Sequence, residues 1–256
     1  MTYKLYEGDC LQIMPLLEDK SVDMILCDLP YGTTACKWDT VIPFEPLWNE
    51  YERLIKPDGA IVLTASQPFS SKLVMSNLKL FKYEWIWEKE QGTNFLNCNH
   101  QPLKTHENIL IFGKMATSYS KKGNMKYSPQ KIGGKPYKTV RSAGCESWRY
   151  DKEKGSNVTI NHGERFPNSI IKFNRQTGLH PTQKPVKLFE YLIKTYTNEG
   201  DLVLDNCAGS GTTGVACKHL NRDCILIEKE QKYCEIIQNR LEQLTKFEEQ
   251  TQLVIS

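Results

Sequence analysis

Four consecutive residues near the start of the chain have the chemistry needed to hold a flat ring that carries an amino group. The carboxylate of Asp28 can accept a hydrogen bond from an N–H group. Pro30 has no N–H and keeps Leu29 extended, which can present the Leu29 carbonyl as a second acceptor. Tyr31 supplies a ring that can stack. An ordinary strand-end turn with an Asp cap has the same composition, so this stretch needs support from elsewhere in the chain.

A glycine-rich stretch far along the chain supplies that support. An apolar run, residues 202–204, leads into Asp205-Asn206-Cys207-Ala208-Gly209-Ser210-Gly211-Thr212, a pattern that indicates a strand, a glycine turn and the start of a helix. Glycines let the backbone approach a ligand closely, and a helix N-terminus offers free N–H groups. Glu228 ends the next apolar run and can accept both ribose hydroxyls of a nucleoside cofactor.

Together, the two stretches resemble the catalytic and cofactor motifs of the S-adenosylmethionine-dependent amino-group DNA methyltransferases. The catalytic motif comes first, as in the permuted β group of that family, and the resemblance covers nearly the whole chain. It implies an α/β fold with a doubly wound, Rossmann-like methyltransferase sheet, permuted, with an inserted recognition subdomain. It also implies duplex DNA as the partner, S-adenosylmethionine as the cofactor, and no metal.

The resemblance assigns the cofactor site residue by residue. Gly209 and Gly211 resemble the glycines close to the methionine part of the cofactor, Glu228 resembles the ribose-binding acid, and Asp9 resembles the acid near the adenine. In the run from His180 to Pro185, the implied donors to the cofactor carboxylate are Thr182 and Lys184. The whole implied cofactor-binding set is Asp9, Thr182, Lys184, Asp205, Cys207, Ala208, Gly209, Ser210, Gly211, Thr212 and Glu228.

The same resemblance makes Asp28, Leu29, Pro30 and Tyr31 the catalytic residues. An exocyclic amino group is a poor nucleophile because its lone pair is delocalised into the ring. Two acceptors that hold its hydrogens out of plane localise that lone pair for in-line methyl transfer. The base must leave the duplex to reach such a pocket, and stacking on Tyr31 offsets part of that cost. An acid at position 28 is more typical of adenine N6 enzymes and a serine of cytosine N4 enzymes, so adenine is expected and cytosine is the alternative.

The elements that position these motifs follow from the apolar pattern. We predict strands over residues 4–6, 24–28, 60–64, 83–87, 106–112, 202–205 and 224–228, and helices over 10–17, 44–55, 68–78, 186–196, 212–220 and 231–246. This alternation predicts a doubly wound sheet. In the permuted sheet that the resemblance implies, Asp28 and Asp205 would lie at the carboxyl ends of neighbouring strands, where open α/β sheets bind ligands. Residues 88–105 are expected to form a polar loop.

The alternation lapses over residues 114–175, which we interpret as an inserted target-recognition region between a catalytic half, 1–113, and a cofactor-binding half, 176–256. Residues 113–175 carry 14 Lys and Arg against 4 Asp and Glu, about +10, whereas the whole chain carries +3, so the remainder carries about −7. A basic segment in an acidic chain indicates a polyanion site. The expected DNA-binding residues are Lys121, Lys122, Lys126, Lys131, Lys135, Lys138, Arg141 and Arg149.

Other classes of protein explain less of the sequence. Gly209, Gly211 and Gly214 also match the dinucleotide fingerprint, but an NAD-dependent oxidoreductase leaves the Asp28 motif and the basic insertion without a role. A non-catalytic DNA-binding protein accounts for the insertion and not for the two motifs. A protein or RNA methyltransferase can use a similar tetrapeptide, and the permuted order with a long basic insertion favours DNA.

Composition also restricts the compartment and the partners. The chain has no apolar run long enough to span a membrane, and its nine cysteines include no C-x-x-C pair. They are therefore expected to be reduced residues of a cytoplasmic protein and not zinc ligands or disulfides. The sequence contains no evident nuclease motif and leaves open a homodimer and a separate restriction endonuclease.

Overall fold

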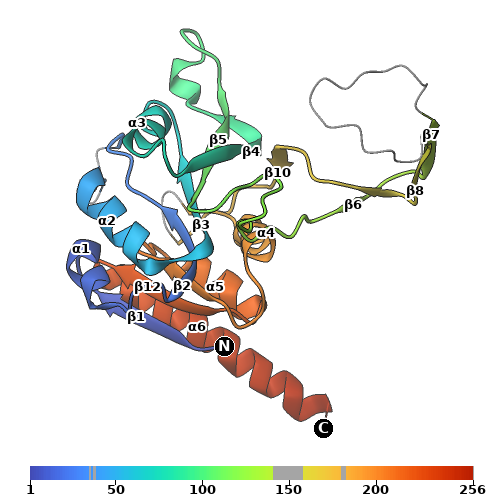
Figure 1. Ribbon diagram of the computed structural model, residues 1–256. Helices are drawn as coiled ribbons and strands as arrows, with labels where there is room; N and C mark the ends of the chain where they lie inside the picture. The colour runs from blue at the N-terminus through green and yellow to red at the C-terminus, as the bar shows by residue number, and fades with distance from the viewer. Residues whose placement is uncertain (35, 37–38, 141–157, 180–182, 256) are drawn as a thin grey trace. The chain divides into compact units, whose positions relative to one another are not determined.

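An eight-stranded sheet forms the centre of the larger of two compact units of the chain, residues 1–128 and 169–256 (Figure 1). The computed structural model describes residues 1–34, 36, 39–140, 158–179 and 183–255. The strand order is β1 (Tyr3–Glu7), β12 (Asp223–Glu228), β11 (Leu202–Asp205), β2 (Val22–Asp28), β3 (Ile55–Ala65), β5 (Lys104–Gly113), β4 (Phe81–Thr93) and β10 (Ile170–Lys172). β5 is antiparallel to both of its neighbours, and the other neighbouring pairs are parallel.

Helices cover both faces of this sheet. One core cluster packs the sheet against α1 (Cys10–Ile13), α2 (Phe44–Leu54) and α3 (Phe69–Ser76), and the other packs it against α4 (Val186–Tyr196), α5 (Thr212–His219) and α6 (Gln231–Ile255). β2 shows why its sequence is almost continuously apolar. Met24 and Leu26 belong to one cluster and Ile25 and Cys27 to the other, because a parallel strand in such a sheet is buried on both faces. The predicted doubly wound sheet is confirmed.

The helices bury the faces that their sequences mark as apolar. In α2 the buried side chains are Leu47, Trp48, Tyr51 and Leu54, which lie on one face because three or four residues make one turn. The predicted helix over 186–196 is α4, with the same bounds. Two short 3-10 turns, η1 (Met14–Leu16) and η2 (Phe95–Asn97), also belong to this unit.

The polar loop expected over residues 88–105 is wrong for much of its length. β4 continues to Thr93 and β5 already begins at Lys104, and these two residues pair across the hairpin. The hairpin projects from the sheet (Figure 1), and η2 lies near its tip. A projecting two-stranded ribbon needs no buried face, so its sequence shows no apolar alternation.

The second compact unit, Pro129–Asn168, lies inside the predicted insertion and is shorter than it. It contains two small antiparallel sheets, one formed by β6 (Ile132–Gly133) with β9 (Glu164–Arg165) and one by β7 (Tyr137–Val140) with β8 (Val158–Asn161). The outer parts of the predicted insertion belong to the larger unit, where β10 pairs with β4. Among the described residues, no helix has both the length and the apolar character needed to cross a membrane.

Candidate active site

The two motifs meet because β2 and β11 are neighbours. Ile25 pairs with Leu204, so the strands end side by side at Asp28 and Asp205. From this point β2 leads to α2 on one face of the sheet, whereas β11 leads to α5 on the other face. Such a reversal opens a crevice at the carboxyl ends of the strands, where α/β proteins bind ligands. The expectation that these two strands are neighbours is confirmed.

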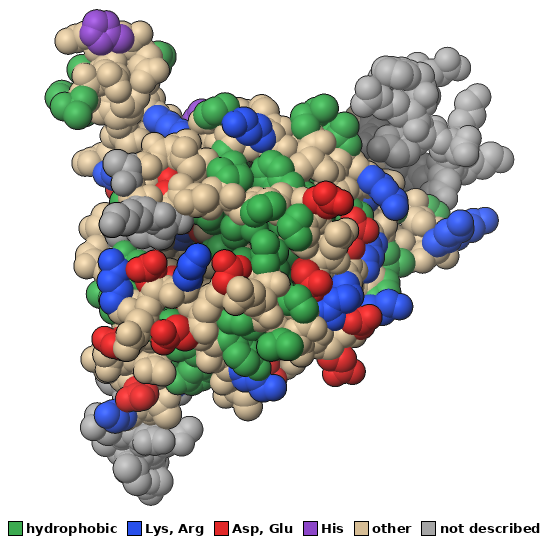
Figure 2. All heavy atoms as spheres, turned by 90° about the vertical axis from the view of Figure 1, so that its left-hand side faces the viewer, with side chains coloured by type: hydrophobic (Ala, Val, Ile, Leu, Met, Phe, Trp, Pro, Cys, Tyr) green, Lys and Arg blue, Asp and Glu red, His purple; other side chains and the backbone are tan. Residues whose placement is uncertain are grey.

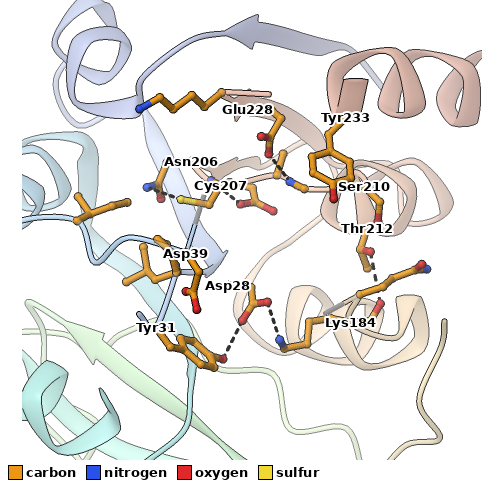
Figure 3. A pocket seen from close by; sticks show the side chains of 18 of the residues that line it. Asp28, Tyr31, Asp39, Lys184, Asn206, Cys207, Ser210, Thr212, Glu228 and Tyr233 are labelled. Carbon is orange, nitrogen blue, oxygen red and sulfur yellow. Dashed lines mark hydrogen bonds and ion pairs between the residues drawn. The ribbon is translucent and has the colours of Figure 1, made fainter. Parts of the chain in front are cut away.

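A cavity of about 570 Å³ lies at this edge and is lined by residues of both motifs (Figure 3). Asp28 and Tyr31 form one side, and Cys207, Ser210 and Glu228 form the other. The left-hand side of Figure 1 is shown in Figure 2, where hydrophobic side chains gather near the centre and Asp, Glu, Lys and Arg side chains surround them. The lining of the cavity combines apolar residues, such as Leu29 and Val41, with polar groups, as small-molecule sites do.

The Asp28 carboxylate accepts hydrogen bonds from three parts of the fold. Its Oδ1 accepts hydrogen bonds from the Tyr31 hydroxyl, at 2.8 Å, and from the hydroxyl of Thr64 on β3. Its Oδ2 accepts one from the Lys184 ammonium, at 2.5 Å (Figure 3). The Asp28 carboxylate is thus held in one orientation at the carboxyl end of β2.

Tyr31 is fixed through its ring as well as its hydroxyl. The ring stacks on Phe69 of α3, with 5.1 Å between centroids and 24° between planes. Burial, followed by the charge of Asp28, raises the pKa of the Tyr31 hydroxyl well above its usual value, so it stays a donor. Phe69 was absent from the predicted site, because nothing in the sequence of α3 relates it to residue 31.

The carboxylate of Asp39, which is not among the predicted site residues, shapes the loop after Tyr31. Asp39 is buried and accepts hydrogen bonds from the backbone N–H groups of Gly32, Thr33 and Thr34, at 2.8, 2.9 and 2.6 Å. These donors outweigh the effect of burial and lower the pKa of Asp39. A carboxylate that accepts three N–H groups fixes the path of the chain beside the catalytic motif.

Lys184 joins two carboxylates in the floor of the cavity. Its Nζ lies 2.5 Å from Asp28 Oδ2 and 3.5 Å from Glu107 Oε2, and Lys89 Nζ lies 2.5 Å from the other Glu107 oxygen. Burial lowers the pKa of Lys184, but Asp28 and Glu107 outweigh burial and raise it above its usual value. The resemblance implied a contact to the cofactor carboxylate for Lys184, and the structure places its ammonium on Asp28 instead. Glu107 was not in the predicted site set.

The glycine loop is organised by Glu228. One carboxylate oxygen accepts the N–H of Gly209 at 2.7 Å and the other accepts the N–H of Glu230 at 2.9 Å. Two of about four acceptor positions are therefore in use, which leaves acceptors for a pair of hydroxyl groups. Gly211 has φ +78°, and a Cβ there would lie 2.8 Å from the Ile237 side chain, so only glycine fits. Gly211 packs against α6 and does not line the cavity.

Asp205 supports this loop from beneath. It is buried, and it accepts hydrogen bonds from the Cys207 N–H, at 3.1 Å, and from the Thr213 hydroxyl. Burial raises the pKa of Asp205 to about 7, although both of these donors act in the opposite direction. The other predicted cofactor residues that the structure describes line the cavity, namely Asp9, Lys184, Cys207, Ala208, Gly209, Ser210, Thr212 and Glu228. Thr182 lies outside the described residues.

The predicted DNA-binding residues divide into three groups. Lys126 does not match that role, because its ammonium bonds Asp23 at 2.8 Å and Asp201 at 2.9 Å, where β2 and β11 begin, at the edge opposite the cavity. Arg141 and Arg149 lie outside the described residues. The remaining lysines are exposed, and of these Lys131 pairs with Glu164: Lys121, Lys122, Lys131, Lys135 and Lys138.

The described residues include no group of three or more His, Cys, Asp or Glu side chains that could hold a metal ion.

A family model described as DNA methylase matches residues 22–239, which include both motifs and the second unit. The chain belongs to the DNA methylase family.

Curated relatives of this DNA methylase resemble it over most of its length. The type II methyltransferase M.HpaI of Haemophilus parainfluenzae is 30% identical over 94% of this chain and 75% of the relative. The type II methyltransferase M2.MboI of Moraxella bovis is 24% identical over 95% of this chain and 89% of the relative.

Solved structures agree with the fold of this DNA methylase. The M1.HpyAVI–SAM complex has a TM-score of 0.61 and 25% identity, and the match covers 94% of this chain and 100% of that chain. The cytosine-N4-specific PvuII DNA methyltransferase has a TM-score of 0.63, 14% identity, and coverage of 94% and 93%. The fold is therefore that of the Rossmann-like DNA methyltransferases. The family match shows that this chain is a DNA methyltransferase.

Proposed function

We propose that this DNA methyltransferase methylates N6 of adenine at specific sites in duplex DNA. The observation that carries the proposal is the position of Asp28, at the end of β2, beside the Leu29 carbonyl and facing the same cavity as the glycine loop. An amino group held there meets two acceptors at once. Cytosine N4 is the alternative target, since its amino group has the same geometry.

The cofactor half of the cavity suits S-adenosylmethionine, which supplies the methyl group when it is bound. Glu228 retains acceptors for ribose hydroxyls, and Asp9 lines the same cavity. Gly209 brings the backbone close to the ligand, because a side chain is absent there. These residues bind and orient the cofactor and take no part in bond making.

The target half of the cavity suits an exocyclic amino group. The Asp28 carboxylate and the Leu29 carbonyl would accept its two hydrogens and so localise its lone pair, which is the effect that a preorganised polar site contributes. Leu29 is 3% exposed, so its backbone is held firmly by the core. Tyr31, backed by Phe69, offers a rigid ring for the base.

A base inside a duplex cannot reach this cavity, so the proposal includes base flipping, which costs a few kcal/mol. Phosphate contacts would provide most of the binding free energy. Exposed lysines are available for them in both compact units, among them Lys122 in the larger unit and Lys138 in the smaller one.

Adenine is favoured over cytosine because residue 28 is an acid. A carboxylate at this position is more typical of the adenine N6 enzymes of the family, and a serine is more typical of the cytosine N4 enzymes. The preference concerns one residue, so it calls for a chemical test.

That test is nucleoside analysis of DNA from cells that express either the wild-type protein or Asp28→Ala. We expect N6-methyladenine with the wild-type protein and none with the variant, while the purified variant still binds S-adenosylmethionine by calorimetry. N4-methylcytosine in place of N6-methyladenine would overturn the adenine assignment. Normal methylation by Asp28→Ala would overturn the role of Asp28.

A further inference from the structure

Lys184 occupies the positions that a target base needs. Its ammonium bonds Asp28 Oδ2 at 2.5 Å, the oxygen left open by Tyr31 and Thr64, and it stands over the Tyr31 ring at 5.7 Å from the centroid. Lys184 thus takes one of the two acceptor positions of that oxygen. A base cannot stack on that side of the ring while the ammonium stands over it. Lys184 must therefore move before a target base can stack on this face of Tyr31.

The structure offers the displaced ammonium one nearby acceptor. Glu107 Oε2 lies 3.5 Å from Lys184 Nζ, too far for a well-formed hydrogen bond. Within the described part of the chain it is the buried side-chain oxygen that has no hydrogen-bond partner. The other oxygen of Glu107 is held by Lys89 at 2.5 Å, so the carboxylate is fixed with Oε2 toward the lysine.

We propose that Glu107 is a positioning residue that receives the Lys184 ammonium when the target amino group takes its place on Asp28. This inference rests on the proposed function, in which Asp28 holds the target amino group. Lys184 is then a placeholder that keeps Asp28 paired in the absence of DNA and takes no part in the reaction itself.

The charges around the cavity floor make this exchange feasible. Lys89, Glu107, Lys184 and Asp28 alternate in sign, and the side chains of Lys89 and Lys184 are 7% and 6% exposed. A buried ammonium that leaves one carboxylate without reaching another is strongly unfavourable. A shift from 3.5 Å to a charged hydrogen bond of about 2.8 Å moves Nζ only slightly and keeps the ammonium paired throughout.

The alternative destination for Lys184 is the carboxylate of the cofactor, which the sequence resemblance implied. The two destinations make different predictions. If Lys184 moves to the cofactor, Lys184→Met weakens S-adenosylmethionine binding and Glu107→Gln leaves the rate unchanged. If it moves to Glu107, Glu107→Gln slows methyl transfer and cofactor binding is unaffected.

The decisive variant is Glu107→Gln, in which a neutral amide replaces the carboxylate, so its oxygen can accept a hydrogen bond from the ammonium but cannot form an ion pair with it. Steady-state methyl transfer to DNA at saturating cofactor should show kcat reduced at least about tenfold, with KM for DNA and Kd for S-adenosylmethionine within about twofold of wild type. Glu84→Gln is the matched control, an exposed glutamate of β4 bonded to Asn108, and it should behave as wild type.

Lys184→Met completes the test. If Glu107 acts by receiving the Lys184 ammonium, adding Glu107→Gln to Lys184→Met should lower the kcat of that variant by no more than about twofold, whatever its own rate. An unchanged kcat in Glu107→Gln, or an equal loss from Glu107→Gln in both backgrounds, would overturn the inference. If Glu107→Gln does not fold, Glu107→Asp is judged by the same comparison.

Failure of the inference and failure of the proposed function are distinguishable. Asp28→Ala is inactive under the proposed function whether or not Glu107 receives Lys184. Activity in Asp28→Ala would therefore reject the proposed function, whereas an inactive Asp28→Ala beside a fully active Glu107→Gln would reject only the role of Glu107.

Discussion

Asp39 Oδ1 accepts a hydrogen bond from the Gly32 N–H at 2.8 Å and so closes the loop that follows the catalytic motif. The second carboxylate oxygen of Asp39 accepts the next two N–H groups of the chain. Gly32 has φ +67°, a conformation that favours glycine, and a Cβ there would lie 2.9 Å from the Val41 side chain. These three hydrogen bonds to Asp39 therefore require a glycine at position 32, where the chain turns tightly after Tyr31.

Asp39→Ala should destabilise the fold and slow methyl transfer more than it weakens cofactor binding. Three N–H groups lose their acceptor, and although water replaces part of it, the free energy of unfolding should fall by roughly 2 kcal/mol. Thermal unfolding and single-turnover methyl transfer are the measurements. Asp19→Ala, which removes an exposed carboxylate paired with Arg53, is the control. An Asp39→Ala protein with an unchanged rate of methyl transfer would show that the hydrogen bonds to Asp39 do not position the catalytic motif.

Glu228→Ala should weaken S-adenosylmethionine binding without affecting DNA affinity. The variant loses the acceptors for the ribose hydroxyls and also releases the Gly209 N–H. Hydrogen bonds to a charged group contribute roughly 1.5–3 kcal/mol, so Kd should rise by about tenfold or more. Calorimetric titration checks this, with Glu235→Ala on the exposed side of α6 as the control. Wild-type affinity in Glu228→Ala would remove Glu228 from the cofactor site.

The sequence predicts the edge of the sheet where the site lies, because two apolar runs each end in an acid. Asp28 and Asp205 mark the ends of buried strands, and the glycine pattern after Asp205 indicates a tight turn before a helix. That these strands are neighbours follows from the resemblance to the permuted methyltransferases, because the alternation of elements does not fix the order of strands in a sheet. Local pattern and residue chemistry are sufficient to locate the two strand ends themselves.

The residues that the sequence does not predict act through contacts between distant segments or through the backbone. Glu107 lies in a strand, and its pairing with Lys184 joins residues far apart in the chain. Asp39 bonds main-chain N–H groups in a loop, which leaves no periodic signal. Lys126 lies in a segment whose basic composition is typical of DNA binding, yet its ammonium forms ion pairs with Asp23 and Asp201. Composition describes a segment, whereas the partner of a single charge depends on the tertiary fold.

Asp205 should make the stability of the cofactor-free protein depend on pH. Burial raises the pKa of Asp205 to about 7, whereas an unfolded Asp titrates near 4. The folded state therefore keeps a proton that the unfolded chain releases, and stability falls as pH rises from about 4 to 7, with no further change above that range.

Asp205→Asn is neutral at every pH and should lose this dependence. Its amide can still bond the Cys207 N–H, and the Thr213 hydroxyl can reverse to accept from the amide. The melting temperature of the wild-type protein should drop more between pH 5 and pH 8 than that of Asp205→Asn. Parallel melting profiles for the two proteins would mean that Asp205 titrates in its ordinary range.

Lys138→Ala and Lys126→Ala should separate a DNA-binding lysine from a structural one, although both lie in the basic part of the sequence. Lys138 is exposed on β7, so its loss should reduce the slope of log K against log salt by about 1 if it contacts a phosphate, with the melting temperature unchanged.

Lys126 pairs with Asp23, which is 2% exposed, and with Asp201. Removing its ammonium leaves the buried Asp23 with Lys56 as its remaining ion-pair partner among the described residues, so the melting temperature should fall while the salt slope stays unchanged. DNA binding by fluorescence anisotropy at several salt concentrations and thermal unfolding of both variants provide the comparison. A reduced salt slope in Lys126→Ala would contradict its structural assignment.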